Sequence, residues 1–231
     1  KEIWQVNSPL HTPGTVIHTL GWPLDQQTYG GEFLYHLAEN QVVIGYIVGL
    51  DYQNPYLSPF EEFQRFKLHP AIRPLLEGGK RLNYGARALN EGGWKSIPRL
   101  VFPGGSLIGC SAGFLNVAKI KGTHTAMKSG MLAAEGIAQA LKGNPNDYED
   151  RFHQSWVAQE LFQARNIRPG FRWGLIPGIL NAALETYIFR GRAPWTFSNH
   201  PDHAQLQKAL NCTPIEYPKP DGVITFDRLS S

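Results

Sequence analysis

Short apolar runs, separated by glycine and proline, dominate the first half of the chain. Apolar and polar residues alternate over 1–20 and predict two strands, with the stretch 9–14 between them. The glycine pair Gly30-Gly31 then precedes an alternating run over 33–37, and a continuous apolar run covers 42–50. This order predicts a strand, a glycine bend, a strand, a turn and a strand, in an antiparallel or mixed sheet.

The next segment carries the signals of a short helix. Ser58 is the predicted N-cap of a helix that begins at Pro59. Phe60, Phe63 and Phe66 recur on one face of that helix, and an aromatic stripe at this spacing is more often core than ligand contact. A second helix is expected before Pro74, and a further strand at 83–86.

Residues 100–136 form the stretch around which the chain is organised. Two short apolar runs, 100–102 and 107–108, predict a hairpin whose last strand stops at Gly109. A helix is predicted over 126–135, with Thr123 or Thr125 as its N-cap. A strand, a glycine and a helix N-terminus aimed at one spot form half of a flavin or dinucleotide site, although ordinary α/β packing uses the same arrangement.

The C-terminal half is more helical. An amphipathic helix is predicted over 147–165, with Tyr148, Phe152 and Leu161 on its apolar side. Within the segment 171–195, the uninterrupted apolar content is shorter than the roughly 20 residues that span a bilayer, and arginines and aromatic residues lie at both ends. This pattern favours a helix lying in the membrane surface over a buried core helix with basic ends.

The last forty residues predict an extended, proline-rich linker over 212–222 and a strand over 223–226. His200 and His203 lie in a polar loop, where solvated histidines are more common than metal ligands.

Composition excludes several classes of protein. A net charge of +3, with lysine and arginine spread along the chain, gives no basis for nucleic-acid binding. Cys110 and Cys212 are the only cysteines, too few for a four-thiolate cluster or a disulfide framework. No arrangement of residues suggests hydrolysis, so no catalytic residue and no metal ligand is predicted. The start at Lys1, inside a strand-like pattern, suggests a sequence cut from a longer one.

Three segments resemble one family, the electron-transfer-flavoprotein:ubiquinone oxidoreductases. The resemblance covers essentially the whole chain and is carried by 28–37, 84–93 and 109–130. Related flavoproteins have an acidic residue after the strand-ending glycine, but here that position is Cys110. Alanine stands at 112 and 118, where the family is expected to have proline, so the loop is expected to be less rigid.

The resemblance implies two binding sites. The residues expected to contact FAD are Gly109, Cys110, Gly113, Asn116, Lys121, Gly122 and Thr123. The paired glycines Gly30 and Gly31 are expected to hydrogen-bond the carbonyl group of ubiquinone. The family's first flavin motif, G-x-G-x-x-G, and the four cysteines of its iron–sulfur domain are absent from these 231 residues, so the FAD site is expected to be partial.

The expected fold class is α+β of the α/β flavoprotein type. The resemblance assigns 1–97 to a mixed or antiparallel quinone-binding domain and 98–143 to a returning part of the FAD-binding domain. It assigns 144–231 to a helical segment with a membrane-surface helix, from about Trp173 to Phe189, and a linker toward an iron–sulfur domain.

In the intact family, electrons pass from electron transfer flavoprotein through the cluster and FAD to ubiquinone. The implied location is peripheral on the inner membrane, on the mitochondrial matrix side or the bacterial cytoplasmic side. Two alternatives remain open. One is a flavin-dependent hydroxylase or prenyl reductase. The other is a non-catalytic module that binds quinone and membrane.

Overall fold

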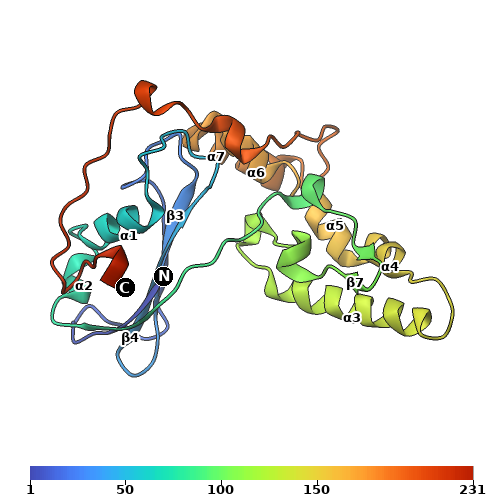
Figure 1. Cartoon of the computed structure of the whole chain (residues 1–231), viewed down its shortest axis with the longest axis horizontal. Coiled ribbons are helices and arrows are strands. Elements are labelled where there is room, and N and C mark those ends of the chain that lie inside the picture. The colour runs from blue at the N-terminus through green and yellow to red at the C-terminus, as the bar shows by residue number, and fades with distance from the viewer. Residues whose placement is uncertain (231) are drawn as a thin grey trace. The chain divides into compact units, whose positions relative to one another are not determined.

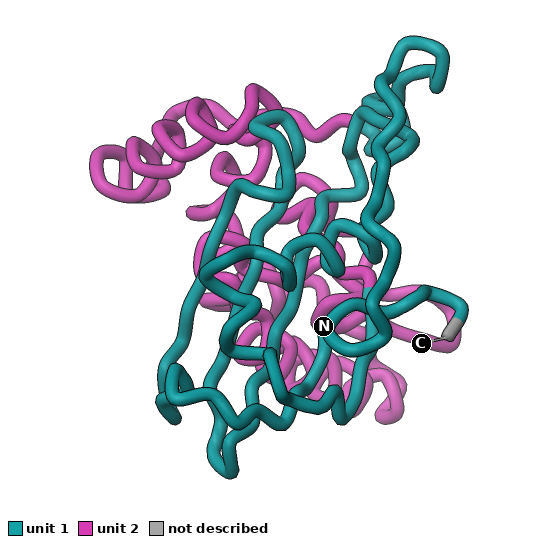
Figure 2. Tube along the Cα trace, turned by 90° about the vertical axis from the view of Figure 1, so that its left-hand side faces the viewer, with its two compact units in different colours: residues 1–87, 201–231 teal, residues 88–200 magenta. Residues whose placement is uncertain are grey.

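Two compact units make up the computed structural model, which describes residues 1–230 (Figures 1 and 2). Unit 1 combines 1–87 with 201–231, and unit 2 is 88–200. Unit 2 therefore interrupts unit 1 along the chain. These limits differ from the expected boundaries at 97 and 143, and the functional assignment of the three predicted segments stays a prediction.

A five-stranded antiparallel sheet is the framework of unit 1. Its strands, in the order β2-β3-β4-β1-β5, are β2 Val16–Thr19, β3 Gly30–His36, β4 Gln41–Val48, β1 Glu2–Gln5 and β5 Lys80–Tyr84. Every neighbouring pair is antiparallel. Burial alternates along β1 and β3, as expected for a sheet covered on one face. The predicted antiparallel sheet is confirmed.

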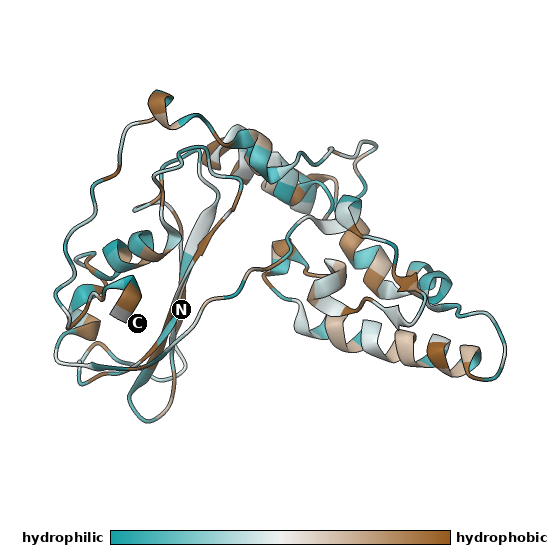
Figure 3. Cartoon of the chain, viewed as in Figure 1, coloured by the Kyte–Doolittle hydropathy of each residue, from teal (hydrophilic) through white to brown (hydrophobic). Residues whose placement is uncertain are grey.

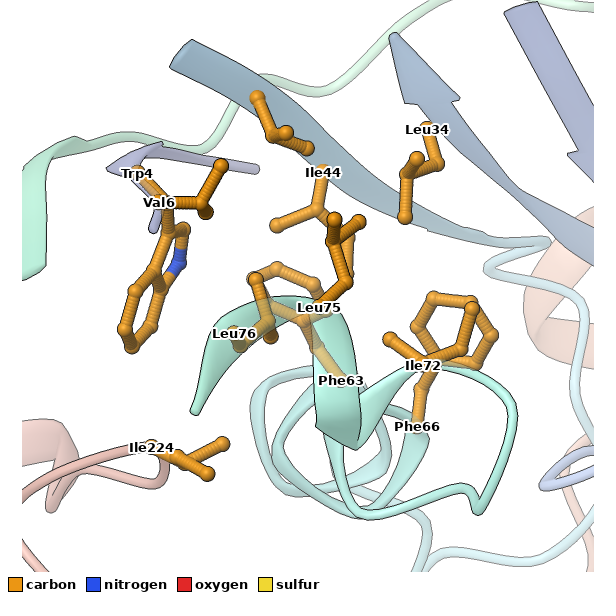
Figure 4. Close-up of a cluster of buried hydrophobic side chains, with 11 residues drawn as sticks. Trp4, Val6, Leu34, Ile44, Phe63, Phe66, Ile72, Leu75, Leu76 and Ile224 are labelled. Carbon is orange, nitrogen blue, oxygen red and sulfur yellow. The ribbon is translucent and has the colours of Figure 1, made fainter. Parts of the chain in front are cut away.

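Two helices, α1 (Pro59–Lys67) and α2 (Arg73–Leu76), cover one face of this sheet (Figure 1). The side chain of Ser58 accepts a hydrogen bond from the Glu61 N–H, which confirms the predicted cap. Helix α2 contains Pro74 near its start instead of ending before it. The core between the helices and the sheet consists of Trp4, Val6, Leu34, Val42, Ile44, Phe63, Phe66, Ile72, Leu75, Leu76 and Ile224 (Figure 4).

A buried ion pair joins β1 to α1. Lys67 Nζ lies 3.0 and 3.1 Å from the two carboxylate oxygens of Glu2, and both side chains are almost fully buried. The same carboxylate accepts a 2.7 Å hydrogen bond from Trp4 Nε1, and Arg81 Nη1 lies 3.5 Å away. Burial lowers the pKa of Lys67 to about 8, against the opposing effect of Glu2.

The predicted strand over 223–226 is wrong, because these residues form a turn. The Asp221 carboxylate accepts hydrogen bonds from the N–H groups of Val223, Ile224 and Thr225. These backbone groups are therefore not available to a strand partner. Burial acts to raise the pKa of Asp221, but the backbone hydrogen bonds outweigh it and bring the value to about 2. The turn inserts Ile224 into the core of unit 1.

Unit 2 is built mainly from helices. Its elements are η1 Gly93–Ser96, β6 Val101–Phe102, β7 Gly105–Ser106, η2 Gly109–Ala112, η3 Val117–Lys119, α3 Thr123–Ala140, α4 Tyr148–Gln154, α5 Trp156–Gln163, α6 Ile167–Gly170, η4 Phe171–Trp173, α7 Leu175–Ala183 and the π-helical turn η5 Leu184–Ile188. Hydrophilic and hydrophobic positions are mixed along helix α3 (Figure 3). The hydrophobic core of unit 2 consists of Leu100, Ala112, Phe114, Leu132, Ala133, Tyr148, Phe152, Val157, Ala158 and Leu161.

The single helix predicted over 147–165 is two helices, α4 and α5. Ser155 separates them with an extended backbone, ψ 160°, and its hydroxyl donates to the Phe152 carbonyl at 2.7 Å. A serine side chain that bonds a nearby backbone carbonyl competes with helix continuation. The apolar side was predicted correctly, since Tyr148, Phe152 and Leu161 are buried. None of the described helices is long and apolar enough to cross a membrane.

Candidate functional site

Gly30 and Gly31 are the first two residues of β3, so the bend predicted between two strands is wrong. The register pairs Gly30 with Val48 and Gly31 with Ile47 on β4. The glycines therefore continue the ladder, and the loop that precedes them makes the change of direction.

The hydrogen bonds at the far end of β3 set the direction of its backbone groups. The His36 N–H donates to the Thr15 carbonyl, on the side of β2. The Leu37 N–H donates to the Gln41 carbonyl, on the side of β4. Because successive residues of a strand point their peptide groups to opposite neighbours, even-numbered residues of β3 face β2 and odd-numbered residues face β4.

This alternation distinguishes the two glycines. Gly31, an odd residue, directs its N–H and C=O to β4. Gly30, an even residue, directs them toward β2, but β2 ends at Thr19, opposite Glu32. The peptide groups of Gly30 thus point beyond the last residue of β2. We call this place the glycine edge: Gly30, Gly31 and the end of β2.

The space around the glycine edge explains why both positions are glycine. A Cβ atom on Gly30 would lie 2.4 Å from the Ile47 carbonyl oxygen and 2.4 Å from Leu24 Cδ1. A Cβ atom on Gly31 would lie 2.9 Å from the Thr19 carbonyl oxygen. Apolar side chains nearby in the chain are exposed to solvent, namely Leu20, Trp22 and Leu50. An apolar ligand carrying one hydrogen-bonding group would meet suitable partners here.

A buried carboxyl group, Glu32, adjoins the glycine edge. Its Oε2 atom accepts a hydrogen bond from the Thr19 hydroxyl, while Oε1 is buried with no hydrogen-bond partner among residues 1–230. Burial raises the pKa of Glu32, and the Thr19 hydrogen bond acts in the opposite direction. Sequence analysis missed this residue, although the alternation after Gly30 places it on the covered face.

In unit 2, the strand predicted to stop at Gly109 ends earlier, at Ser106. Gly109 instead begins the short helix η2, with φ 56°, and its N–H donates to Ser129 Oγ at 3.0 Å. A Cβ atom at Gly109 would lie 3.0 Å from the Cβ of Ala126. Close approach to α3 and a positive φ both require glycine here.

Four more of the predicted flavin contacts lie in the segment that begins immediately after Gly109. Cys110 is an exposed free thiol, and Gly113 caps η2 with φ 79° while donating its N–H to the Cys110 carbonyl. Asn116 and Lys121 exchange two backbone hydrogen bonds, of 3.0 and 3.2 Å, which close the loop that contains η3. Lys121 is itself exposed.

The start of α3 differs from the prediction. Gly122 is the N-cap and has no side chain to cap the helix, so the expected cap at Thr123 or Thr125 is wrong. The Thr125 hydroxyl donates instead to the carbonyls of Phe114 and Gly122. Thr123 is the exposed first residue of the helix. An uncapped helix start presents backbone N–H groups and a partial positive charge.

Glu160 on α5 holds this loop to the start of α3, and sequence analysis did not find it. Its carboxylate accepts from Asn116 Nδ2 at 2.9 Å and Lys119 Nζ at 2.7 Å, and lies 2.7 Å from His124 Nε2. Burial acts to raise the pKa of Glu160, but the hydrogen bonds from Lys119, His124 and Asn116 prevail and bring the value to about 2. A partner this distant in sequence leaves no local signal.

The predicted surface helix is composed of α7 and the turn η5. Their exposed apolar side chains, with Trp173 just before them, are Ile176, Ile179, Leu180, Leu184, Tyr187 and Ile188. Glu185, in contrast, is buried, and its Oε1 accepts a 2.9 Å hydrogen bond from Asn166 Nδ2. The segment therefore has a polar inner contact and an apolar outer face.

Arg165 fixes the chain that follows this segment. Its guanidinium is buried and donates to the carbonyls of Phe162, Gly191, Ala193 and Trp195 and to the hydroxyl of Thr196. It also lies over the ring of Phe162, 3.9 Å from the centroid. One side chain thus holds residues 191–196 against α5.

The two histidines of the polar loop, His200 and His203, do not belong to a group of potential metal ligands among residues 1–230. Arg172 Nη1 lies 3.3 Å from His200 Nε2, and His203 is exposed. Among residues 1–230, no three histidine, cysteine, aspartate or glutamate side chains come together in a way that could hold a metal ion.

Comparison with known proteins relates the sequence of this chain to one family. Residues 1–89 match the family described as "ETF-QO, ubiquinone-binding". The chain is 57% identical over 230 residues to an electron transfer flavoprotein-ubiquinone oxidoreductase of Oryza sativa subsp. japonica, covering 98% of this chain and 40% of the relative. The corresponding proteins of Rattus norvegicus and Homo sapiens are 58% and 57% identical over 246 residues, covering 100% of this chain and 40% of each relative.

The chain belongs to the electron transfer flavoprotein-ubiquinone oxidoreductase family. This confirms the resemblance drawn from the sequence. The chain spans about 40% of the length of these curated relatives. Residues 1–89, which match the ubiquinone-binding family, include the whole glycine edge and Glu32. The predicted flavin contacts, 109–123, lie outside it.

Proposed function

We propose that this chain carries the ubiquinone site and part of the FAD site of an enzyme that transfers electrons from electron transfer flavoprotein to ubiquinone. The observation that carries the proposal is the glycine edge, which lies inside the segment matched to a ubiquinone-binding family. The relatives' names favour this function over a flavin-dependent hydroxylase or a prenyl reductase.

In the proposed quinone site, Gly30 offers its peptide groups to a quinone carbonyl beyond the end of β2. The register favours Gly30 over Gly31 for this contact, because the peptide groups of Gly31 face β4. Leu20, Trp22 and Leu50 then supply an apolar surface for the isoprenoid chain. Binding would combine one oriented polar contact with burial of a hydrocarbon tail.

The residues around η2 and α3 fit a flavin in two respects. Gly109 and Gly113 have positive φ and no side chain, so the backbone can approach a flat ring closely. The uncapped start of α3 places a partial positive charge next to Gly122 and Thr123. When bound, FAD would supply the electrons for quinone reduction. The iron–sulfur cluster of the intact family has no ligand set among residues 1–230.

Substitution of Gly30 tests the quinone site. Gly30→Val is expected to weaken binding of a short-chain ubiquinone at least about tenfold, because the added side chain would press against the Ile47 carbonyl and Leu24 and displace the peptide groups of Gly30. Quenching of tryptophan fluorescence measures binding, and thermal melting reports folding. Gly85→Ala is the matched control, since no atom lies within 4 Å of a Cβ at that position.

A second variant guards against a folding defect in Gly30→Val. Trp22→Ala removes an exposed ring and leaves β3 intact, and it should also weaken quinone binding. A folded Gly30→Val protein with wild-type affinity would contradict the assignment of the glycine edge.

We also propose that α7 and η5 lie in the surface of a membrane, at the inner mitochondrial membrane in a mitochondrial relative. The exposed apolar face and the flanking Arg172, Arg190 and Arg192 support this. The resemblance to the family also implies this membrane contact, and it implies electron transfer flavoprotein as the partner that donates electrons.

Vesicle binding tests the membrane contact. Leu180→Asp is expected to reduce binding to anionic phospholipid vesicles by about tenfold or more, because a charge replaces an exposed apolar side chain that would enter the lipid. Co-sedimentation measures the bound fraction. Leu141→Asp is the control, since Leu141 is more exposed but lies beyond the end of α3. Equal loss in both variants would argue against a specific contact through α7.

A further inference from the structure

Glu32 is placed to reach a ligand at the glycine edge. It is the next even-numbered residue after Gly30, so its peptide groups face the same neighbouring strand. Two residues of a strand span about 7 Å. The hydrogen bond from the Thr19 hydroxyl draws the Glu32 carboxyl toward the last residue of β2, beyond which Gly30 points.

The state of the second carboxyl oxygen is informative. Glu32 is only 3% exposed, and Oε1 has no hydrogen-bond partner in the part of the chain that the structure describes. A buried carboxylate oxygen without a partner is costly, whereas a neutral carboxyl group is much less so. A neutral Glu32 that keeps its Oε2 contact with Thr19 would carry its proton on Oε1, the oxygen that has no partner among residues 1–230.

Several polar groups face this region from the packed elements. Thr19 comes from β2, and Tyr46 lies directly opposite on β4, with a buried hydroxyl group that has no partner among residues 1–230. Helix α1 contributes Glu62 and Arg65, which form an ion pair 3.0 Å apart, and Tyr217 donates to Glu62 at 2.9 Å. Arg65 is therefore already paired with Glu62, and burial raises the pKa of both Glu32 and Tyr46.

We propose that Glu32 donates a proton to a ubiquinone bound at Gly30 when that quinone is reduced. This inference rests on the proposed function. Reduction of the quinone to quinol takes two electrons, which a reduced flavin supplies and thereby becomes oxidised, and two protons. The O–H bond of Glu32 breaks as an O–H bond forms on the quinone oxygen held at Gly30. Solvent supplies the second proton to the other oxygen and later restores the proton of Glu32, and the flavin releases its own protons to solvent as it is oxidised.

The experiment uses the full chain, a short-chain ubiquinone and photoreduced free FMN as the electron donor. Quinone binding is measured first by tryptophan fluorescence, and quinol formation is then followed by stopped-flow absorbance. Glu32→Gln is expected to bind quinone within about twofold of the wild type but to form quinol on the order of 100-fold more slowly, as for the loss of a general acid. Glu39→Gln, an exposed residue beyond the other end of β3, is the control and should match the wild type.

The pH profile gives a readout that a structural role would not change. A donor must carry its proton, so the wild-type rate should fall as pH rises through the raised pKa of Glu32. The rate of Glu32→Gln should show no such fall. Infrared spectroscopy of the wild type provides a measurement that needs no variant, because a protonated carboxyl band should be present at neutral pH and should shift when quinone binds.

The outcomes separate the two proposals. Bound quinone with an unchanged rate in Glu32→Gln, or with no carboxyl band that responds to quinone, would overturn the role of Glu32 and leave the quinone site standing. A wild-type chain that binds no quinone would overturn both. If Glu32→Gln does not fold, the infrared result on the wild type decides.

Discussion

Replacing Lys67 by methionine is expected to lower the free energy of unfolding of unit 1 by about 3–5 kcal/mol, the usual cost of breaking a buried ion pair from one side. The variant leaves the Glu2 carboxylate buried, with Trp4 Nε1 and the more distant Arg81 as its remaining contacts. Urea unfolding followed by circular dichroism measures the change.

Two further variants test whether the effect of Lys67→Met depends on the burial of the ion pair. Arg73→Met removes an exposed ion pair with Glu77, in which both side chains are about half exposed, and should change the free energy of unfolding by less than about 1 kcal/mol. The double variant Glu2→Leu with Lys67→Met removes both charges and should recover most of the loss. If Lys67→Met were as mild as Arg73→Met, the pair would contribute nothing that depends on its burial.

Replacing Arg165 by methionine should destabilise unit 2 by a similar amount, about 3–5 kcal/mol. The substitution leaves the buried carbonyls of Gly191 and Ala193 without the donors that now lie 2.9 and 2.6 Å away. Each buried acceptor that loses its partner costs about 1–3 kcal/mol. Thermal and urea unfolding measure the loss, and proteolysis near 191–196 should increase.

Two controls sharpen the test of Arg165. Arg165→Lys keeps the charge but cannot reproduce a planar group that donates in five directions, so it should also be destabilising. Arg192→Met, at an exposed arginine within the same loop, should change the free energy of unfolding by less than about 0.5 kcal/mol. Equal effects at Arg165 and Arg192 would mean that the guanidinium network does not hold the loop.

The elements that were located correctly from the sequence are those determined by residues close together in the chain. Ser58 caps α1 because its hydroxyl and the Glu61 N–H are three residues apart, and the alternation of β3 reflects a sheet covered on one face. The family was found in the same way, from contiguous motifs at 28–37 and 109–130.

The errors have tertiary causes. Gly30 and Gly31 suggested a bend, but their backbone continues the ladder with β4 and the lack of a Cβ serves close packing against Ile47 and Thr19. Asp221 turns the predicted strand at 223–226 because its carboxylate captures three backbone donors. Neither outcome follows from hydrophobic periodicity.

The candidate sites were predicted in part for the same reason. Glycines with required conformations, such as Gly109, stand out in a motif, whereas Glu160 reaches Asn116 across 44 residues and leaves no local trace. Whether the predicted contacts bind FAD and quinone stays a prediction that the substitutions above address.

The insertion of unit 2 into unit 1 has a consequence for synthesis on the ribosome. The sheet and α1 emerge before unit 2, but Ile224 and Phe226, which complete the packing around Trp4, leave the ribosome only after unit 2 has been synthesised. At about 5–20 residues per second, the nascent sheet waits on the order of ten seconds for this cover. During that interval the part of the core around Trp4 lacks Ile224 and Phe226, and the chain can close its first unit only after translation has passed the second.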